Sequence, residues 1–233
     1  MNMNLNHKKQ IARITVYIIG MIVLAMGLTL NAQTHLGVAP VMSIPYSLSV
    51  IYDKDYGNVT LAVYVIFVLI EILIHLYLKY YKFIIVDVFQ IAFSLVFTRF
   101  LDLFNAVCPD FQVDLGGTIW GSIPIRITFL GLGIVLTGVG AAMMLNARII
   151  PNPADGLVQA FSDLTGKDIG LVKNCLDAVC VVITCVMSFS LSGSLVGIGI
   201  GTLLSLIGVG RVIAIYNRLV LTPLPEKHQN PNA

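Results

Sequence analysis

Long apolar runs separated by short polar breaks dominate the chain. Runs of roughly the 20 residues that a membrane-spanning helix needs lie near residues 11–31, 58–79, 83–102, 124–146, 170–190 and 194–217. Two shorter apolar segments, 38–52 and 153–165, contain or adjoin prolines and are too short to cross a bilayer as helices. We therefore predict an all-α polytopic membrane protein with six spans and two short re-entrant or interfacial half-helices.

The pattern occurs twice along the chain. A shift of 113 positions gives eleven identities in the forty-seven ungapped positions that pair 13–59 with 126–172, whereas composition alone would give roughly three or four. The matched pairs include Arg13 and Arg126, Gly20 and Gly133, Gly27 and Gly140, and Pro40 and Pro153. Each half has three spans, an odd number, so the second half enters the membrane upside down. The sequence thus predicts two inverted repeats.

These boundaries predict a first repeat at 1–102, an extracytoplasmic loop at 103–123, a second repeat at 124–217 and a cytoplasmic tail at 218–233. With the N-terminus inside, eleven Lys and Arg residues lie on the cytoplasmic side and three, Lys54, Arg99 and Arg126, lie outside. This bias follows the positive-inside rule and places both termini in the cytoplasm. An eight-span alternative, in which both short segments cross, gives the same charge score, and only segment length favours six.

Composition narrows the class of protein and its partners. Hydrophobic residues make up 57% of the chain and charged residues 11%, far below the roughly one-quarter charged residues of soluble domains. The net charge of +2 and the long uncharged runs argue against nucleic acid as a partner. The lipid bilayer is the predicted surrounding, and assembly as a homo-oligomer or with a partner subunit stays open.

The chain carries none of the common catalytic or metal-binding motifs, such as HExxH, GxSxG or a P-loop. Its four cysteines do not have the spacing of a metal site, because three of them lie five apart on one apolar helix and so turn away from a common face. We predict no enzymatic activity, no catalytic residue, no metal site and no cofactor.

Acidic residues in and beside the apolar segments are the candidates for a binding site. Asp155 follows Pro153 in the second short segment, where it either caps the helix or contacts a ligand. Asp177 lies within the fifth span, four residues after Lys173 and three after Asn174. It forms either an internal ion pair with Lys173 or part of a functional site, because a carboxylate inside a span is costly.

Two further features leave alternatives open. Glu71 and His75 stand four apart on one helix face, and Asp87 and Gln90 open the next span. These residues could form a proton or cation relay, but His75 and Asp87 are expected at the headgroup level, which leaves Glu71 as the deeper candidate. The glycine-rich stretch 192–202, which ends at Thr202, favours close helix packing, with local unwinding as the functional alternative.

Several short motifs together resemble a known family. They are PADG at 153–156, Thr165-Gly166 with the following Gly170, Asp177 in the next span, and GIGT at 199–202 with Gly208 and Gly210 after it. They resemble the YczE/YyaS/YitT group of integral membrane proteins over most of the chain. The resemblance implies a multi-pass protein of the bacterial cytoplasmic (inner) membrane and supplies no substrate.

Paired short segments in inverted repeats are the architecture of many secondary transporters, whose site lies at the repeat interface. We therefore expect a permease for a small molecule or ion, with its site between the two short segments. The competing hypothesis is a non-transporting membrane subunit that assists or anchors a partner complex. The candidate substrate-binding residues are Asp155, Asp177, Asn174, Lys173, Pro153, Gly156, Thr202 and Glu71.

Overall fold

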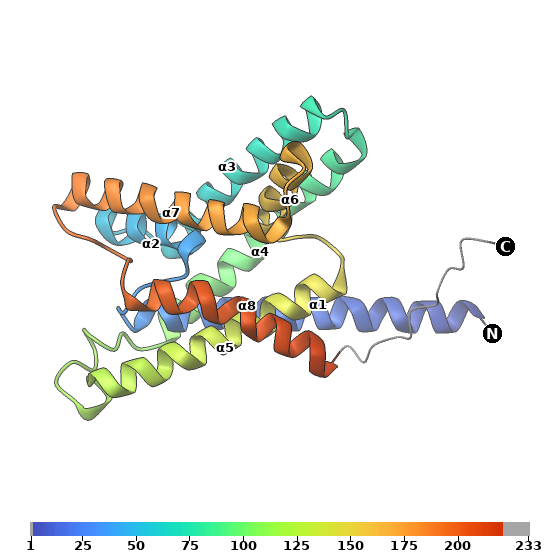
Figure 1. Ribbon diagram of the computed structural model, residues 1–233. Coiled ribbons are helices and arrows are strands. Elements are labelled where there is room, and N and C mark those ends of the chain that lie inside the picture. The colour runs from blue at the N-terminus through green and yellow to red at the C-terminus, as the bar shows by residue number, and fades with distance from the viewer. Residues whose placement is uncertain (1, 221–233) are drawn as a thin grey trace.

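A computed structural model describes residues 2–220, with side chains from residue 10 onward. Within those residues the protein is all-α, as predicted, and has no strand (Figure 1). The helices are α1 (Asn2–Gln33), α2 (Pro40–Tyr52), α3 (Tyr56–Tyr77), α4 (Tyr81–Val107), α5 (Ile123–Ala147), α6 (Pro153–Thr165), α7 (Ile169–Ser192) and α8 (Ile200–Val220), with a 3₁₀ turn, η1 (Ile119–Gly121), before α5.

Six of these helices, α1, α3, α4, α5, α7 and α8, are long and apolar enough to cross a membrane. The other two, α2 and α6, have 13 residues each, which gives a helix of roughly 20 Å. That length falls short of the hydrocarbon core of a bilayer, about 30 Å. The structure therefore contains the six spans and two short helices that the sequence predicts.

Local sequence explains where the short helices begin and end. Pro40 and Pro153 occupy the first helical position of α2 and α6, where a proline loses no hydrogen bond. The side chain of Asn152 caps α6 by accepting a hydrogen bond from the Ala154 amide, at 3.1 Å. Asp155 lies within the first turn, after Ala154. The capping role that the sequence gives as one alternative for Asp155 is therefore filled by Asn152.

The last span begins later than predicted, because the glycine-rich stretch before it is not helical. Gly193 and Gly197 adopt positive φ angles of 70° and 80°, which glycine tolerates without steric cost. The Gly197 carbonyl accepts a hydrogen bond from the Val38 amide at 3.0 Å, and the Gly201 amide donates to the Leu36 carbonyl at 2.7 Å. The stretch is therefore unwound, while Gly199 and Gly201 still provide the close packing that the sequence favours, here against the backbone of Leu36 and Gly37.

Helices α1 and α5 run antiparallel and pack along their length (Figure 1). Four glycines let the two backbones approach: a Cβ added to Gly27 would lie 2.4 Å from the Thr137 amide, and one added to Gly140 would lie 2.4 Å from the Leu24 amide. Gly20 meets Gly140, and Gly27 meets Gly133. A shift of 113 positions converts one pair into the other, so the crossing is reciprocal.

The two ends of the α1–α5 pair carry matching contacts from arginine. Arg13, near the start of the apolar part of α1 (Gln10–Gln33), donates to the Ala147 carbonyl at the end of α5, at 2.8 and 3.1 Å. Arg126, near the start of α5, donates to the Thr34 carbonyl just after α1, at 2.8 Å. Positions 13 and 34 lie 113 residues before 126 and 147. Each arginine thus satisfies a carbonyl that a helix end leaves free.

We expect Arg126→Gln and Arg13→Gln each to lower the free energy of unfolding by about 1–3 kcal/mol, the usual value of a hydrogen bond to a charged group. Because Arg13 is more exposed than Arg126, its loss should cost less. Thermal unfolding of the purified variants in detergent measures both effects. Arg211→Gln is the control, since Arg211 is exposed on α8, and an equally large loss there would contradict the prediction.

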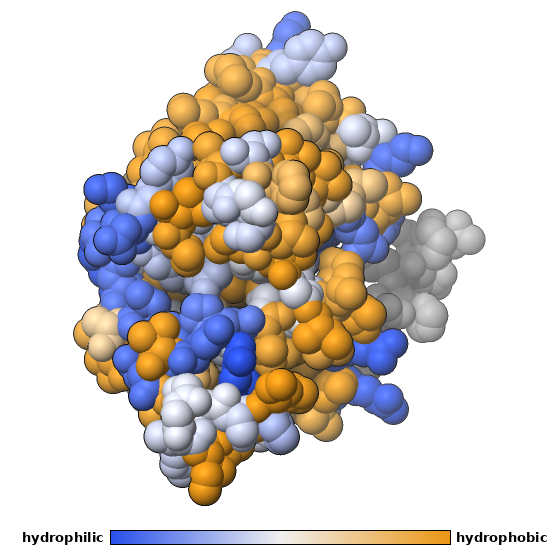
Figure 2. Space-filling model, turned by 90° about the vertical axis from the view of Figure 1, so that its left-hand side faces the viewer, coloured by the Kyte–Doolittle hydropathy of each residue, from blue (hydrophilic) through white to orange (hydrophobic). Residues whose placement is uncertain are grey.

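The remaining helices pack in corresponding pairs. Helix α2 packs on α7, and α6 packs on α3, while α4 lies on α1 and α8 on α5. Much of the outer surface is apolar, and only 6% of the apolar window of α8 is buried. Seen from the end that holds the α7–α8 connection and the 108–122 loop, hydrophilic residues gather toward one side and the centre, beside broad hydrophobic surfaces (Figure 2).

Candidate functional site

A cavity of about 350 Å³ lies among α3, α4, α5 and α6. We call it the Glu71 cavity. Its ionisable and polar lining residues are Glu71, His75, Asp87, Arg148, Asn152, Asp155, Gln159 and Asp163. Four carboxylates therefore face this space against a single arginine. An acidic wall of this kind favours a cationic ligand over an anionic one.

The deepest part of this wall is a cluster of three buried side chains from α3 and α4. Glu71, His75 and Asp87 are only 3%, 4% and 1% exposed. His75 Nδ1 and Asp87 Oδ2 are 2.7 Å apart, and one potential ligand atom from each of the three residues lies within 4.8 Å of the others. Three ionisable groups are thus held together away from lipid.

His75 and Asp87 lie near the ends of α3 and α4, where the sequence places them, and the structure shows in addition that their side chains are buried within the protein. The turn between α3 and α4, where Lys79 adopts a φ of 60°, folds α4 back against α3. Residues on either side of the turn therefore face each other. Helix α6 packs on α3 and α4 and helps to cover them, so that polar side chains near the ends of two spans become interior.

Gln90 and Gly156 complete the surroundings of Glu71. The Gln90 amide nitrogen donates to both carboxylate oxygens of Glu71, at 3.0 and 3.1 Å. A Cβ at Gly156 would lie 2.6 and 2.8 Å from these oxygens and 2.9 Å from the Gln90 amide nitrogen. The glycine of the PADG element therefore lets the backbone of α6 pass directly over the carboxylate.

A second polar group joins α6 to α7. Lys173 Nζ lies 4.0 Å from Asp155 Oδ1, and Asp177, 6% exposed, lies within electrostatic reach of both residues. Among the described residues, Lys173 therefore forms its ion pair with Asp155 on α6 rather than the i,i+4 pair with Asp177 that the sequence gives as one alternative. Positions 155, 173 and 177 correspond, 113 positions earlier, to Met42, Thr60 and Tyr64, so the acidic character belongs to one half only.

The other predicted site residues are dispersed. Pro153 is buried at the start of α6, three residues before Gly156. Asn174 is exposed on α7 and does not line the Glu71 cavity. Thr202 is buried at the start of α8, where its hydroxyl would lie 2.7 Å from a Cβ at Gly37, at the other end of the α1–α5 pair from Asp155. The structure therefore brings together Glu71, Gly156 and the Asp155 group but not Asn174 or Thr202.

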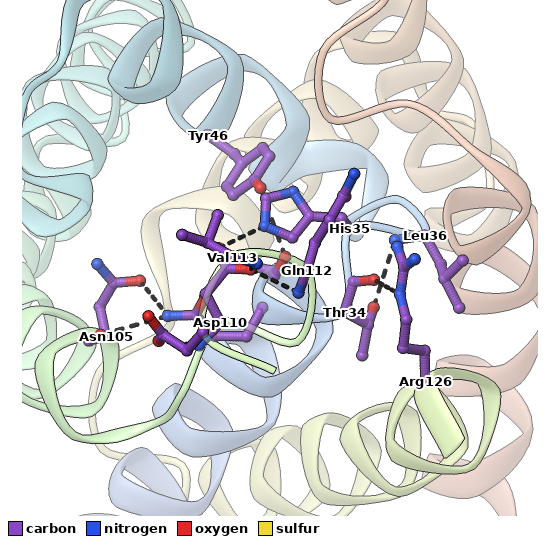
Figure 3. A network of polar contacts seen from close by, with 12 residues as sticks. Thr34, His35, Leu36, Tyr46, Asn105, Asp110, Gln112, Val113 and Arg126 are labelled. Atoms are coloured by element: carbon purple, nitrogen blue, oxygen red, sulfur yellow. Dashed lines mark hydrogen bonds and ion pairs between the residues drawn. The ribbon is translucent and has the colours of Figure 1, made fainter. Parts of the chain in front are cut away.

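A second cavity of about 320 Å³ lies at that other end. We call it the His35 cavity. Its lining includes His35, Tyr46 and Gln112, and the rest is apolar or glycine. Figure 3 shows the polar contacts beside it, which tie the end of α1 to the following loops. His35 contacts Asp110, and the Arg126 contact described above lies nearby (Figure 3).

Asp110 is the hub of this network. Its Oδ1 accepts hydrogen bonds from the amides of Gln112 and Val113, both at 2.8 Å. Partial burial opposes its charge, but the hydrogen bond from His35, the two amides and the attraction of the His35 ring together lower the pKa of this carboxyl group below its ordinary value. The charged form of Asp110 therefore stabilises the fold.

We expect this stabilisation to disappear in acid. A carboxyl group whose pKa is lowered on folding contributes stability above its unfolded pKa, about 3.9, and loses it as the pH falls through the folded value. Asp110→Asn should lower the melting temperature at pH 7, and the difference from the unchanged protein should shrink below about pH 4. Melting curves between neutral and acidic pH measure this. A difference that stays constant with pH would contradict it.

The two cavities are lined by corresponding positions. Seven lining residues of the His35 cavity each differ by 113 positions from a lining residue of the Glu71 cavity. The pairs are Ala32 and Leu145, His35 and Arg148, Gly37 and Ile150, Val38 and Pro151, Tyr46 and Gln159, Val50 and Asp163, and Val196 and Phe83. The shapes correspond, while the chemistry is acidic at one end and nearly uncharged at the other.

Sequence reasoning centred the site on Asp155 and Asp177 and underestimated the α3–α4 cluster. The available signal was the spacing of Glu71 and His75 by four residues and of Asp87 and Gln90 by three, which puts each pair on one helix face. The spacing does not predict that the face of Glu71 and His75 on α3 meets the face of Asp87 and Gln90 on α4, because this depends on how the two helices pack.

Comparison with known proteins identifies relatives and assigns no activity. The model of a family of unknown function (DUF6198) matches residues 11–218. The chain is 26% identical to an uncharacterized membrane protein, YczE, of Bacillus subtilis (strain 168), over 220 residues that cover 87% of this chain and 84% of the relative. It is 25% identical to an uncharacterized protein, YyaS, of the same organism, over 222 residues that cover 91% and 93%. No solved structure matches the chain.

Proposed function

This chain belongs to a family of unknown function (DUF6198), and we propose that it is a permease for a small solute or ion. It is a membrane protein with six apolar helices. In the proposal it resides in the bacterial cytoplasmic membrane with both termini in the cytoplasm. The Glu71 cavity receives the substrate from one side of the membrane, and the His35 cavity opens to the other.

The correspondence of the two cavities carries this proposal. Arg13 contacts the end of α5, and Arg126 contacts the segment after α1, so α1 and α5 are antiparallel and residues 34 and 147 lie at opposite ends. The lining of the His35 cavity includes the residues just after α1, and the lining of the Glu71 cavity includes the residues just after α5. A permease needs one access route from each side of the bilayer, and two routes built from corresponding positions meet that need.

The proposal includes two inverted repeats, α1–α4 and α5–α8. Several contacts are reciprocal under the shift of 113 positions: the two arginine contacts, the glycine pairs and the helix pairs α2–α7 and α3–α6. Because α1 and α5 are antiparallel, the operation that relates the halves turns one upside down. Many secondary transporters are built in this way, with the site at the repeat interface.

The substrate site in this proposal is the Glu71 cavity rather than the space between α2 and α6. Glu71, Gly156 and Asp155 contribute to its wall, while Lys173 on α7 lies 4.0 Å from Asp155. The acidic wall favours a cation or an amine. A non-transporting membrane subunit is the alternative, in which the same cavity would be static.

Accessibility of two matched cysteines tests the proposal without a known substrate. Gln159→Cys and Tyr46→Cys occupy corresponding positions in the two cavities and are introduced into a chain whose four cysteines are replaced. An impermeant thiol reagent should label Gln159→Cys from one face of sealed membranes and Tyr46→Cys from the other. Labelling of both positions from the same face would overturn the inverted arrangement.

A second arm tests movement. Cysteines at His35 and Asp110, which are in contact, are joined by a bifunctional thiol reagent before labelling. A permease that alternates between open states should then change its labelling rate at Gln159→Cys, in the opposite cavity, because the joined residues hold the protein in one state. If joining residues 35 and 110 leaves that rate unchanged, the protein does not alternate, and the static-subunit alternative replaces the permease.

A further inference from the structure

We infer that Glu71, His75 and Asp87 form a binding site for a divalent transition-metal cation. This inference rests on the proposed function only in making the ion the cargo, because binding itself does not require transport. The three side chains offer two carboxylate oxygens and one imidazole nitrogen, with a ligand atom from each within 4.8 Å of the others. An ion near the middle of this set could contact all three.

The charge of the cluster favours a doubly charged ion. In their ordinary states Glu71 and Asp87 carry one negative charge each, and both are at most 3% exposed. Among the described residues, Glu71 has the neutral Gln90 amide as its hydrogen-bond partner, and no lysine or arginine forms an ion pair with either carboxylate. A divalent cation with a neutral imidazole would bring the site to zero net charge, which a buried position requires.

The donor set also selects among divalent ions. Imidazole suits zinc, iron, nickel and copper, whereas magnesium and calcium prefer oxygen ligands throughout. One His nitrogen with two carboxylates therefore points to a first-row transition metal. His75 Nδ1 lies against Asp87. Either Nδ1 gives up this hydrogen bond and binds the metal, or the hydrogen bond orients the ring while Nε2 binds the metal.

Gln90 provides an independent sign that the cluster is incomplete. It is fully buried, and its Oε1 has no hydrogen-bond partner, which is uncommon for a buried polar atom. Its amide already lies against Glu71. Rotation of the amide by half a turn would exchange its oxygen and nitrogen and bring the oxygen to the Glu71 side, where it could serve as a fourth ligand. The Glu71 cavity supplies the entry path, because all three proposed ligands line it.

Binding of Co²⁺ to purified protein tests the site directly. The protein is prepared in detergent without a histidine tag, treated with a chelator and titrated with Co²⁺. A visible absorption spectrum of low-coordinate cobalt at one ion per chain is expected, with Zn²⁺ displacing it and Mg²⁺ failing to do so. The inference would be overturned if the unchanged protein gives no such spectrum and shows no heat of binding with Co²⁺, Zn²⁺ or Mn²⁺. The three residues would then be better explained as a proton relay.

Matched variants locate the ion. Glu71→Gln, His75→Gln and Asp87→Asn should each weaken Co²⁺ binding by at least about 100-fold, and Gln90→Ala by about 10- to 100-fold. The controls are Asp53→Asn, an exposed carboxylate at the end of α2, and His35→Gln, in the other cavity. Both should bind as the unchanged protein does, and loss of binding in either would place the ion elsewhere and overturn the assignment. Size-exclusion profiles check that each variant is folded.

The outcome also separates this inference from the permease. Proteoliposomes are assayed for uptake of radioactive Mn²⁺ or Zn²⁺ alongside the binding measurements. Binding without uptake, in a protein whose two cavities do not alternate, would leave the metal site standing and end the permease. Alternating accessibility without any metal binding would end the metal site and leave the permease standing with another cargo.

Discussion

Replacing Gly140 with leucine should prevent stable folding of the membrane-embedded core. A Cβ at this position would lie 2.4 Å from the Leu24 amide and 2.7 Å from the Gly20 carbonyl. Both obstacles are backbone atoms of α1, so no side-chain movement relieves the clash, and the two helices must separate. Overpacking usually costs about 1–3 kcal/mol, and we expect a loss at or beyond the upper end of that range. Yield after solubilisation and the melting temperature measure it.

Gly131→Leu is the matched control on the same helix. Gly131 is exposed, and a Cβ added there meets no atom within 4 Å. In a membrane its surroundings are lipid, so the added side chain should be tolerated and slightly favour the helix. Equal damage from the two substitutions would show that the loss at Gly140 does not come from the close approach of α5 to α1.

Lys173→Met should be the most damaging single change at the junction of α6 and α7. It removes the cation that lies 4.0 Å from Asp155 and that offsets the charge of Asp177. Removing one partner of a fully buried pair costs about 3–5 kcal/mol. Because Lys173 and Asp155 are 42% and 34% exposed at the side chain, water relieves part of that cost, and we expect a loss below this range. Chemical or thermal denaturation in detergent gives the value.

The double variant Lys173→Met, Asp177→Leu separates structure from function. If Asp177 has only a structural role, the double variant should recover the part of the stability loss that comes from Asp177, since apolar residues can replace buried ionic ones at little cost, while Asp155 still lacks its partner. If Asp177 is needed for the substrate, Asp177→Asn should fold normally and lose activity while Lys173 is intact. A folded double variant with full activity would leave Asp177 with a purely structural role.

The sequence predicts the positions and lengths of the helices well. The short helix α6 runs from Pro153 to Thr165, as the segment 153–165 predicts, because proline, asparagine and glycine at its ends act through local backbone geometry. The number of spans follows in the same way from the length of the apolar runs. Such features depend on residues near one another in the chain, and sequence displays them directly.

The faces of the helices were harder to predict. In a soluble protein the apolar stripe of a helix marks the side that is buried, but in a membrane the lipid-facing side is apolar as well. Leucines and valines along α3 therefore do not reveal that Glu71 and His75 point toward α4 and α6. Glycines do mark buried faces in the sequence, because close approach of two helices needs them, as at the α1–α5 crossing and at Gly156.

The reciprocal contacts between α1 and α5 have the form of an isologous interface, the kind that joins two identical subunits across a two-fold axis. Arg13 and Arg126 each reach the far end of the opposite helix, as they would in a homodimer of one half. Under the proposed duplication, the two halves are fused subunits. The 108–122 loop then acts as a tether that gives each half a high effective concentration of the other. This fusion explains how acidic groups could accumulate in one copy of the cavity and be absent from the other, an asymmetry that a true homodimer, with both copies encoded by one sequence, could not encode.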